Sequence, residues 1–370
     1  MRFLMLNWRD PHNPLAGGAE RVTLGYLSYL VRRGHEAFWF APRFPQADPQ
    51  SIIEGVTILR EGGIGSSIPM ARRWVNRMPR FDLVIDQHHG IPWYAPWWCK
   101  THCISYIHEV LGPIWNTFYR WPYSLIGRWQ ERWTHWFYRR VPFWTASSAT
   151  KAGLHAAGVR QVTLIPYGVH TVALPELDSK PIEQPLRLAS VSRLAPNKRV
   201  DHAISTLERL LAMGLRAHLT VVGSGMAEKQ LQDLAAAKGL AAKVEFTGPL
   251  PEADKDAILK KAHLLLHTSV REGWGLNVIE ANAMGTPAVV YPVAGLVEST
   301  LHEQTGLVSA AETPEALAQS VARLVRNPDE YQRYRRQAWD RAKTFHWDRI
   351  LPRAAEWLEG QARGLPAADL

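Results

Sequence analysis

Residues 271–287 read REGWGLNVIEANAMGTP and follow the apolar run Leu264–Leu266. The run has the length of a buried strand, a loop with two glycines comes next, and a helical segment extends over Leu276–Met284. Gly285 and Pro287 end that segment as glycine and proline commonly end helices. A helix N-terminus preceded by glycines offers unpaired N–H groups and partial positive charge to an anion. These residues therefore predict a strand–loop–helix junction that holds a phosphate.

Two carboxylates, Glu272 and Glu280, flank this junction. They could act as the acid and base of a glycosidase, a pair that lies about 5–10 Å apart across one bond. Glu280 falls further along the helix, where it is better placed to accept a hydrogen bond from a neutral hydroxyl. Solvated surface charge is the usual interpretation of a single Glu. Glycines at 273, 275 and 285 favour a built site instead, because such a junction needs them there.

The length of 370 residues predicts two domains, each with its own core. We expect a first domain at 1–172, a second at 173–345 and a closing helical segment at 346–370. No run of 18 apolar residues occurs, and the N-terminal segment lacks the apolar core of a signal peptide. Cys99 and Cys103 have no second cysteine pair with which to form a zinc site. These features favour a reduced, cytoplasmic protein.

The net charge of +9 is unevenly divided. Residues 1–172 contain 19 Lys and Arg against 10 Asp and Glu, which leaves 24 of each kind (43 − 19 and 34 − 10) for the rest. Of the 16 tryptophans, 12 also precede residue 173. One half is therefore basic and aromatic, which keeps a nucleic-acid-binding protein among the alternatives.

Both halves alternate apolar strand segments with amphipathic helical ones. This alternation predicts α/β domains, each with a parallel sheet covered by helices on both faces. Ligands of such sheets bind at the carboxyl ends of the strands. Gly17-Gly18 and His108 follow predicted strands of the first half, and Ser192–Lys198 follows the first strand of the second half.

Arg193 and Lys198 could neutralise a diphosphate that rests on the helix N-terminus near Leu276. Gly223-Ser224-Gly225 is weak support for a nucleotide loop, because a lone Gly-x-Gly after a strand is common. The first half also lacks a full Gly-x-Gly-x-x-Gly, which argues against a dinucleotide oxidoreductase.

Residues 115–144 are rich in aromatic and basic side chains. The aromatic ones include Trp115, Phe118, Tyr119, Trp121, Trp129, Trp133, Trp136, Phe137, Tyr138 and Trp144, and the arginines are Arg120, Arg128, Arg132, Arg139 and Arg140. Trp129, Trp133, Trp136 and Phe137 share one helical face. That face could lie in the headgroup zone of an anionic membrane, or it could pack on the sheet of its own domain. The sequence leaves both interpretations open.

Together these motifs resemble glycosyltransferase family 4, whose members are retaining enzymes with the GT-B fold. The resemblance covers nearly the whole chain, and its most specific part is Glu272-(seven residues)-Glu280 in its Gly-Trp-Gly-Leu setting. The other matching elements are Gly17-Gly18-Ala19-Glu20, Ser147-Ser148, Ile165–Val169, Arg193 with Lys198, Glu298 and Thr305-Gly306-Leu307. The fold implied is α/β, with two Rossmann-like domains facing a cleft. Residues 346–370 would then return to the first domain.

The resemblance implies a role for each matching residue. His108, Glu272, Arg193 and Lys198 would serve catalysis, with His108 facing the reacting sugar and Glu272 binding its hydroxyls. The residues implied in binding the donor are Gly17, Gly18, Arg193, Lys198, Leu250, Glu272, Gly273, Trp274, Gly275, Leu276, Asn277 and Glu280. Within that set, Glu280 would bind the ribose and Leu250 would contact the base. Ser192 and Trp274 depart from the common glycine and phenylalanine, without removing a charge or blocking a glycine position.

The function implied is transfer of a sugar, with retention, from a nucleotide diphosphate sugar to an acceptor hydroxyl. We expect a UDP- or GDP-sugar as donor, no cofactor, no metal and no nucleic acid. The basic, aromatic half suggests a glycan or lipid-linked acceptor at the inner membrane surface. A nucleotide-sugar epimerase of the same fold and a basic nucleic-acid-binding protein are the alternatives. Donor base, donor sugar, acceptor, linkage and oligomeric state are not determined by the sequence.

Overall fold

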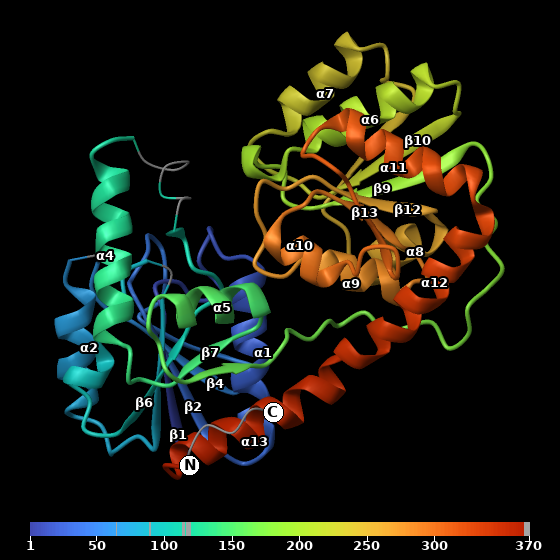
Figure 1. Cartoon of the computed structure of the whole chain (residues 1–370). Coiled ribbons are helices and arrows are strands. Elements are labelled where there is room, and N and C mark those ends of the chain that lie inside the picture. The colour runs from blue at the N-terminus through green and yellow to red at the C-terminus, as the bar shows by residue number, and fades with distance from the viewer. Residues whose placement is uncertain (64, 89, 113–114, 116–119, 366–370) are drawn as a thin grey trace. The chain divides into compact units, whose positions relative to one another are not determined.

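The computed structural model describes residues 1–63, 65–88, 90–112, 115 and 120–365 (Figure 1). The chain forms two compact units. The first consists of Met1–Pro166 with Asp348–Leu370, and the second of Tyr167–Trp347. Their limits fall a few residues from the boundaries expected at 172 and 345. Phe118, Tyr119 and the chain beyond 365 lie outside the described residues.

In the described residues, the first unit contains an eight-stranded sheet in the order β3-β4-β2-β1-β5-β6-β7-β8. Every neighbouring pair runs parallel except β3 with β4, which forms an antiparallel edge. Central β1 is apolar and fully buried after its first residue, as expected for a strand covered on both faces. The strands are β1 (Arg2–Leu6), β2 (Glu36–Ala41), β3 (Gln50–Ile53), β4 (Val56–Arg60), β5 (Leu83–Gln87), β6 (His102–Tyr106), β7 (Phe143–Thr145) and β8 (Val162–Leu164).

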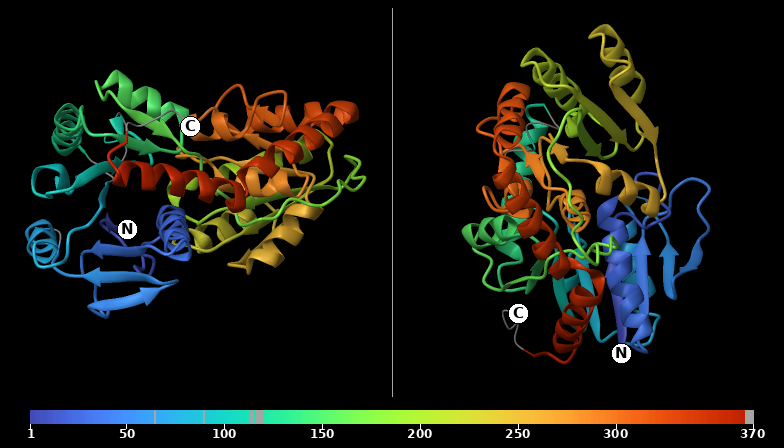
Figure 2. Two further views of the ribbon diagram at one scale, coloured as in Figure 1. Left: turned by 90° about the horizontal axis from the view of Figure 1, so that it is seen from below. Right: turned by 90° about the vertical axis from the view of Figure 1, so that its right-hand side faces the viewer.

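Helices cover this sheet (Figure 1). Among the described residues of the unit, the helices are α1 (Gly18–Arg32), α2 (Ser67–Val75), α4 (Tyr123–Phe137), α5 (Ser148–Ala156) and α13 (Trp347–Ala362), with a short 3₁₀ turn, η1 (Ala95–Trp97). The last of these helices, α13, is red in Figures 1 and 2. It contacts residues that lie much earlier in the chain. Nε of Arg33 donates to Oε1 of Glu359 at 2.7 Å, and the rings of Trp144 and Trp357 lie 5.9 Å apart. The first unit is therefore completed by the end of the chain.

The second unit contains a six-stranded, fully parallel sheet in the order β11-β10-β9-β12-β13-β14. One large apolar cluster fills both sides of it. Its strands are β9 (Leu186–Val191), β10 (Ala217–Val222), β11 (Val244–Gly248), β12 (Leu264–His267), β13 (Ala288–Val290) and β14 (Gly306–Val308). Strand β12 is the buried strand predicted ahead of the 271–287 junction.

Helices form a layer on each face of the second sheet (Figures 1 and 2). One layer is formed by α6 (Val200–Ala212), α7 (Glu228–Ala237) and α11 (Pro314–Arg326). The other is formed by α8 (Glu252–Lys261), α9 (Leu276–Ala283), α10 (Ala294–Ser299) and α12 (Pro328–Ala342). Short 3₁₀ turns are η3 (Pro196–Lys198) and η4 (Lys343–Phe345). No helix in the described part of the chain is long and apolar enough to cross a membrane.

The predicted α/β architecture with two Rossmann-like units is confirmed. In each sheet the strand order reverses at one point, between β1 and β5 in the first unit and between β9 and β12 in the second. In open parallel sheets a crevice forms outside the carboxyl ends of the strands at such a switch point. The fold thus marks one candidate ligand position in each unit.

One of the two interpretations of the aromatic stripe is wrong. Trp129, Trp133 and Trp136 do not pack on the sheet, because they remain 63%, 45% and 50% exposed. Phe137 beside them is also exposed. The stripe therefore belongs to the surface of the first unit.

Candidate functional site

The predicted strand–loop–helix junction lies at the switch point of the second sheet. Helix α9 begins at Leu276, and Gly275 before it adopts a left-handed conformation with φ of 77°. A Cβ atom there would lie 2.8 Å from Oγ of Ser299 and 3.0 Å from Cδ2 of Leu296, so both the backbone angle and the space require glycine. The side chain of Asn277 in the first turn donates to the carbonyl of Val191 at 2.5 Å. This bond fixes the start of α9 beside the end of β9.

Lys198 and Glu272 meet at this edge of the sheet. Nζ of Lys198 contacts Oε1 of Glu272, and Oγ of Ser269 donates to the same oxygen at 2.9 Å. The two loops that carry these residues are joined by backbone contacts. The amide of Val270 donates to the carbonyl of Asn197 at 2.9 Å, and the hydroxyl of Thr268 contacts the carbonyl of Lys198 at 3.1 Å. The fold therefore holds the ammonium and the carboxylate together.

Burial and charge oppose each other at Glu272. Burial acts to raise the pKa of this carboxyl, but the Lys198 ammonium and the hydrogen bonds from Lys198 and Ser269 hold the pKa below its ordinary value. His267, whose Nε2 lies 3.5 Å from the same carboxylate, is fully buried, and burial lowers its pKa to about 4. Near neutral pH the site thus contains an anionic glutamate beside a neutral histidine.

Glu280 is engaged by a lysine that the sequence did not single out. Nζ of Lys255, on α8, lies 3.0 Å from Oε2 of Glu280 and also contacts Glu252. Burial raises the pKa of Glu280, although the attraction of Lys255 opposes that change. Lys255 thus leaves Glu280 able to accept a further hydrogen bond without being an isolated buried charge.

Each of the two carboxylates has a separate lysine partner. Their pKa values move in opposite directions, as those of a catalytic acid and base would. Each carboxylate is nevertheless bound by its own lysine, Glu272 by Lys198 and Glu280 by Lys255. This arrangement favours two separate binding contacts over joint attack on one bond.

The remaining predicted residues of the second unit are placed differently. Arg193 lies at the end of β9, but its side chain is exposed and forms no ion pair with the described residues. Leu250 is half-buried and follows β11. The Trp274 ring is buried, with its centroid 5.5 Å from that of Phe345. Gly273 and Trp274 can therefore offer a ligand mainly backbone groups.

The Gly223-Ser224-Gly225 turn has a packing explanation. A Cβ atom on Gly223 would lie 2.0 Å from the carbonyl oxygen of Ser192, and one on Gly225 would lie 2.3 Å from that of Leu194. Any larger residue would push away the backbone that carries Arg193. These glycines therefore shape the loop after β9.

In the first unit, Gly17 and Gly18 open α1 as predicted. Oε2 of Glu20 accepts a hydrogen bond of 2.6 Å from the amide of Gly17, which satisfies one free N–H group of the helix start. A Cβ atom on Gly17 would have no neighbour nearer than 3.9 Å. Glycine is thus not demanded there by packing within the chain, which leaves room for a ligand to approach the backbone.

His108 lies two residues beyond β6 and is held by Gln87. The side-chain nitrogen of Gln87 lies 2.7 Å from Nε2 of His108, and the side-chain oxygen lies 3.1 Å from the hydroxyl of Thr23 on α1. The carbonyl of His108 accepts a bond from Thr150 at 3.3 Å. The structure thus joins His108 to the helix that begins at Gly18. Sequence reasoning missed Gln87 and Thr23, although Gln87 falls at a strand end, where functional residues are expected.

These groups have complementary chemistry within the second unit. Lys198 and the N-terminus of α9 suit an anion such as a diphosphate. Glu272 and Glu280 suit hydroxyl groups on either side of it. In the first unit, His108 offers an imidazole held in place by a neutral amide.

Two family models match the chain. Residues 177–341 match the model described as "Glycosyl transferases group 1", and residues 16–172 match the model described as "Glycosyltransferase Family 4". The first match spans the Lys198–Glu272 cluster, and the second spans Gly17, Gly18 and His108. Each match falls mainly within one compact unit.

Named proteins are similar to the chain in sequence or in fold. Glycogen synthase from Mycobacterium tuberculosis is 30% identical over 212 residues, which are 57% of this chain and 51% of that protein. The chain thus spans about half the length of that relative. Sucrose-phosphate synthase from Thermosynechococcus elongatus has a TM-score of 0.78 at 17% identity, covering 98% of this chain and 99% of that one. Anabaena HepE, solved with UDP and glucose, has a TM-score of 0.73 at 18% identity, covering 97% and 100%. At these identities the structural likeness concerns the fold.

Proposed function

Since this chain belongs to glycosyltransferase family 4 and has the GT-B fold, we propose that it transfers a sugar from a nucleotide diphosphate sugar to an acceptor hydroxyl. The observation that carries the proposal is the cluster at the β9/β12 switch point. There Lys198, Glu272 and the glycine-led start of α9 lie together at the carboxyl ends of the strands. This is where an open parallel sheet binds a nucleotide.

The donor is held by the second unit in this proposal. Glu272 accepts hydrogen bonds from the sugar hydroxyls, and the backbone at 273–277 receives the sugar and the diphosphate. Glu280 binds the ribose, and Leu250, beyond β11, contacts the base. The buried ring of Trp274 supports a backbone role at that position. The negative charge of Glu280 is already balanced by Lys255. A neutral ribose hydroxyl is therefore a better ligand for this carboxylate than a second cation.

Charge stabilisation accounts for the chemistry. Bond cleavage at the anomeric carbon gives an oxocarbenium-like transition state and a departing nucleoside diphosphate whose negative charge grows. Lys198 and Arg193 neutralise that charge together with the α9 terminus. Lys198 contacts Glu272, so a bound diphosphate would share the ammonium with this carboxylate. Two cations and a helix terminus supply this stabilisation without a metal.

In this proposal the first unit supplies the groups that contact the reacting sugar, the phosphates and the acceptor. We assign His108 to the reacting sugar and the backbone of Gly17 and Gly18 to the phosphates and acceptor. The hydrogen bond from Gln87 gives the His108 ring a fixed orientation, which a residue touching a transition state requires. We propose that the configuration at the anomeric carbon is retained, and Glu109 is a reserve candidate for a nucleophilic role.

For the donor we propose a UDP- or GDP-sugar, and for the acceptor a glycan or a lipid-linked saccharide. The UDP and glucose bound to HepE, whose fold this chain shares, support a UDP-sugar. The named relatives support transfer over epimerisation, since glycogen synthase and sucrose-phosphate synthase are both synthases by name. A bound diphosphate would account for the positive charge at the site. That charge is then no longer an argument for a nucleic-acid-binding protein.

A thermal-shift screen with UDP, GDP, ADP and dTDP sugars tests donor binding. A ligand at about 100 times its dissociation constant stabilises the folded protein by about 3 kcal/mol, so one base should stand out. Repeating the screen with EDTA tests the absence of a metal requirement. If none of the four bases raises the melting temperature, the proposed donor site is wrong.

Product analysis then separates the reactions. A transferase gives a new glycoside only when an acceptor is added, and NMR of its anomeric proton reports retention. An epimerase converts the donor without an acceptor. A glycosidase releases free sugar from a glycoside and needs no nucleotide.

A further inference from the structure

Helix α4 buries the residues that a surface helix usually exposes. Its buried side consists of small and polar residues, Ser124, Gly127, Glu131, Thr134 and His135. Its exposed side carries large apolar residues, Leu125, Ile126, Trp129, Trp133, Trp136 and Phe137. The apolar face of an amphipathic helix ordinarily faces the core. In α4 the two faces are therefore reversed with respect to the first unit.

Specific contacts fix this reversed orientation. Glu131 accepts hydrogen bonds of 2.6 Å from the amides of both Leu111 and Gly112. The ring of Trp115 lies against Gly127, where a Cβ atom would come within 2.2 Å of it. Turning the helix would break the two bonds to a buried carboxylate, which is costly. The aromatic face thus points outward because the opposite face is anchored.

The exposed aromatic side chains contact one another along the helix. The ring centroids of Trp129 and Trp133 lie 5.5 Å apart, and those of Trp133 and Trp136 lie 5.3 Å apart, both edge to face. The row ends with Phe137, whose ring centroid lies 5.8 Å from that of Trp136. An exposed, contiguous row of this kind marks an interaction surface.

The charge on this surface has one sign. Arg128, Arg132 and Arg140 are exposed, and Glu131, the one acid among residues 115–144, is buried. A second copy of the chain would bring like charges together, so a symmetric contact between two such faces is disfavoured. The complementary partner is an anionic surface that also accepts apolar side chains.

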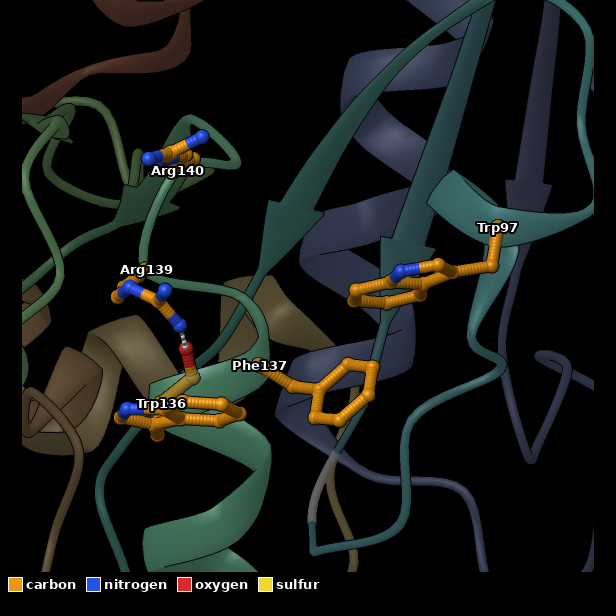
Figure 3. A pocket seen from close by; sticks show the side chains of 5 residues that line it. All are labelled: Trp97, Trp136, Phe137, Arg139 and Arg140. Carbon is orange, nitrogen blue, oxygen red and sulfur yellow. Dashed lines mark hydrogen bonds between the residues drawn. The ribbon is translucent and has the colours of Figure 1, made fainter.

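A hollow at the C-terminal end of α4 combines the same two properties (Figure 3). It has a volume of about 250 Å³ and is lined by Trp97, Trp136, Phe137, Arg139 and Arg140. The Arg139 guanidinium lies 4.3 Å from the Trp136 ring centroid and donates to the Trp136 carbonyl at 2.8 Å. The Trp97 and Phe137 rings lie 4.9 Å apart. Aromatic walls beside two guanidinium groups suit a phosphate-bearing headgroup.

We propose that α4 is a docking surface for an anionic lipid bilayer. Its Trp, Phe, Leu and Ile side chains lie at the boundary between headgroups and acyl chains, with the helix parallel to the membrane. Its arginines contact lipid phosphates, and the hollow receives one headgroup. The cytoplasmic leaflet, which is rich in anionic lipid, is the matching membrane. A bilayer fits better than a nucleic acid because Leu125 and Ile126 have no base-stacking role. This surface is separate from the proposed transfer reaction.

Vesicle co-sedimentation of the full chain tests the proposal. The probes are phosphatidylcholine vesicles with and without about one-third phosphatidylglycerol, at about 0.1 M and 0.5 M NaCl. We expect binding at least about tenfold stronger to the anionic vesicles, weakened by salt. The triple variant Trp129→Ala, Trp133→Ala, Trp136→Ala should lose this binding. The charge reversal Arg128→Glu, Arg132→Glu should remove the preference for anionic lipid.

Matched controls separate the surface from general effects. Arg72→Glu, Arg73→Glu reverses two exposed charges on α2 of the same unit and should weaken binding far less. Ile52→Ala removes an exposed apolar side chain elsewhere and should have no effect. All variants should keep the nucleotide-induced rise in melting temperature, which shows that they fold and that donor binding is independent.

Four results would each overturn the proposal. The first is equal binding to neutral and anionic vesicles, and the second is an equal loss in the α2 control. The third is a wild-type dimer that the Trp variant converts to a monomer without lipid, which would make the face an interface between copies. The fourth is salt-sensitive DNA binding that is tighter than vesicle binding.

Discussion

The side-chain amide of Gln87 lies 2.7 Å from Nε2 of His108, and the other end of the same amide lies 3.1 Å from the hydroxyl of Thr23. Gln87 is buried at the end of β5, and its neighbour Asp86 is bound by the hydroxyl of Tyr138 at 2.6 Å. The ring of His108 is therefore oriented by a residue that has little freedom of its own. Gln87 is a positioning residue for His108.

Replacing Gln87 by Leu keeps the volume but removes the hydrogen bond. We expect kcat to fall about tenfold, as for the loss of one hydrogen bond of about 1.4 kcal/mol, with KM for the donor nearly unchanged. Gln87→Glu replaces the donating amide nitrogen by a carboxylate oxygen that can only accept, so it should not restore the original bond and kcat should stay low. Equal kcat in Gln87→Leu and wild type would show that the bond has no functional role.

Lys198→Ala should reduce turnover about 10²–10³-fold, the size of effect seen when a preorganised stabilising group is lost. Lys198 contacts Glu272 at the predicted diphosphate position. The matched control is Lys229→Ala, which removes an exposed lysine paired with Asp233 within α7 and should leave turnover unchanged. Steady-state kinetics with saturating donor makes the comparison. Near-normal turnover in Lys198→Ala would refute the proposed role.

Gly275→Ala should weaken nucleotide binding about tenfold or more, because overpacking at the start of α9 costs about 1–3 kcal/mol. The added Cβ would lie 2.8 Å from Oγ of Ser299. Gly239→Ala is the control, since Gly239 has a similar φ of 69° but no atom within 4 Å of an added Cβ. Both variants should lose about 1 kcal/mol of stability from the left-handed backbone. Calorimetric titration with UDP or GDP should show weaker binding only in Gly275→Ala.

Stability should fall as the pH drops from 6.5 toward 4. Burial lowers the pKa of His135 and of His267 to about 4, while the unfolded chain binds these protons near the ordinary value of 6.5. The unfolded state therefore holds more protons in this range, and stability rises with pH. Each histidine should account for roughly 2 kcal/mol between pH 7 and pH 5.

Urea denaturation at a series of pH values measures this effect. His135→Gln removes one titrating group and should flatten the dependence of the unfolding free energy on pH. His218→Gln, at an exposed position of β10, should leave the slope as it is in the wild type. A His135→Gln slope equal to that of the wild type would contradict the assignment.

The alternation of apolar segments was enough to predict two parallel α/β units, because covered strands must be apolar. Helix α9 begins at the predicted Leu276 and ends at Ala283, one residue early. The antiparallel edge strand β3 was not predicted, since Gln50–Ile53 is partly exposed and has no continuous apolar run. Strands β13 and β14 are three residues each, too short for a periodic signal.

Site residues could be predicted from the sequence where a charged residue follows the end of a predicted strand, as Lys198 and Glu272 do. The partners that set their chemistry could not be predicted in this way. Lys255 and Gln87 are ordinary residue types in the sequence, and only the fold brings them to Glu280 and His108. The periodicity of α4 likewise identified an aromatic stripe without its direction. That direction depends on Glu131 and the amides of a distant loop.

The first unit is discontinuous along the chain, and this orders events during synthesis. A ribosome makes Tyr167–Trp347, a complete compact unit, before it makes α13. Until then Arg33 lacks Glu359 and Trp144 lacks Trp357. The unit that contains the N-terminus can therefore complete its packing only after the second unit has been synthesised.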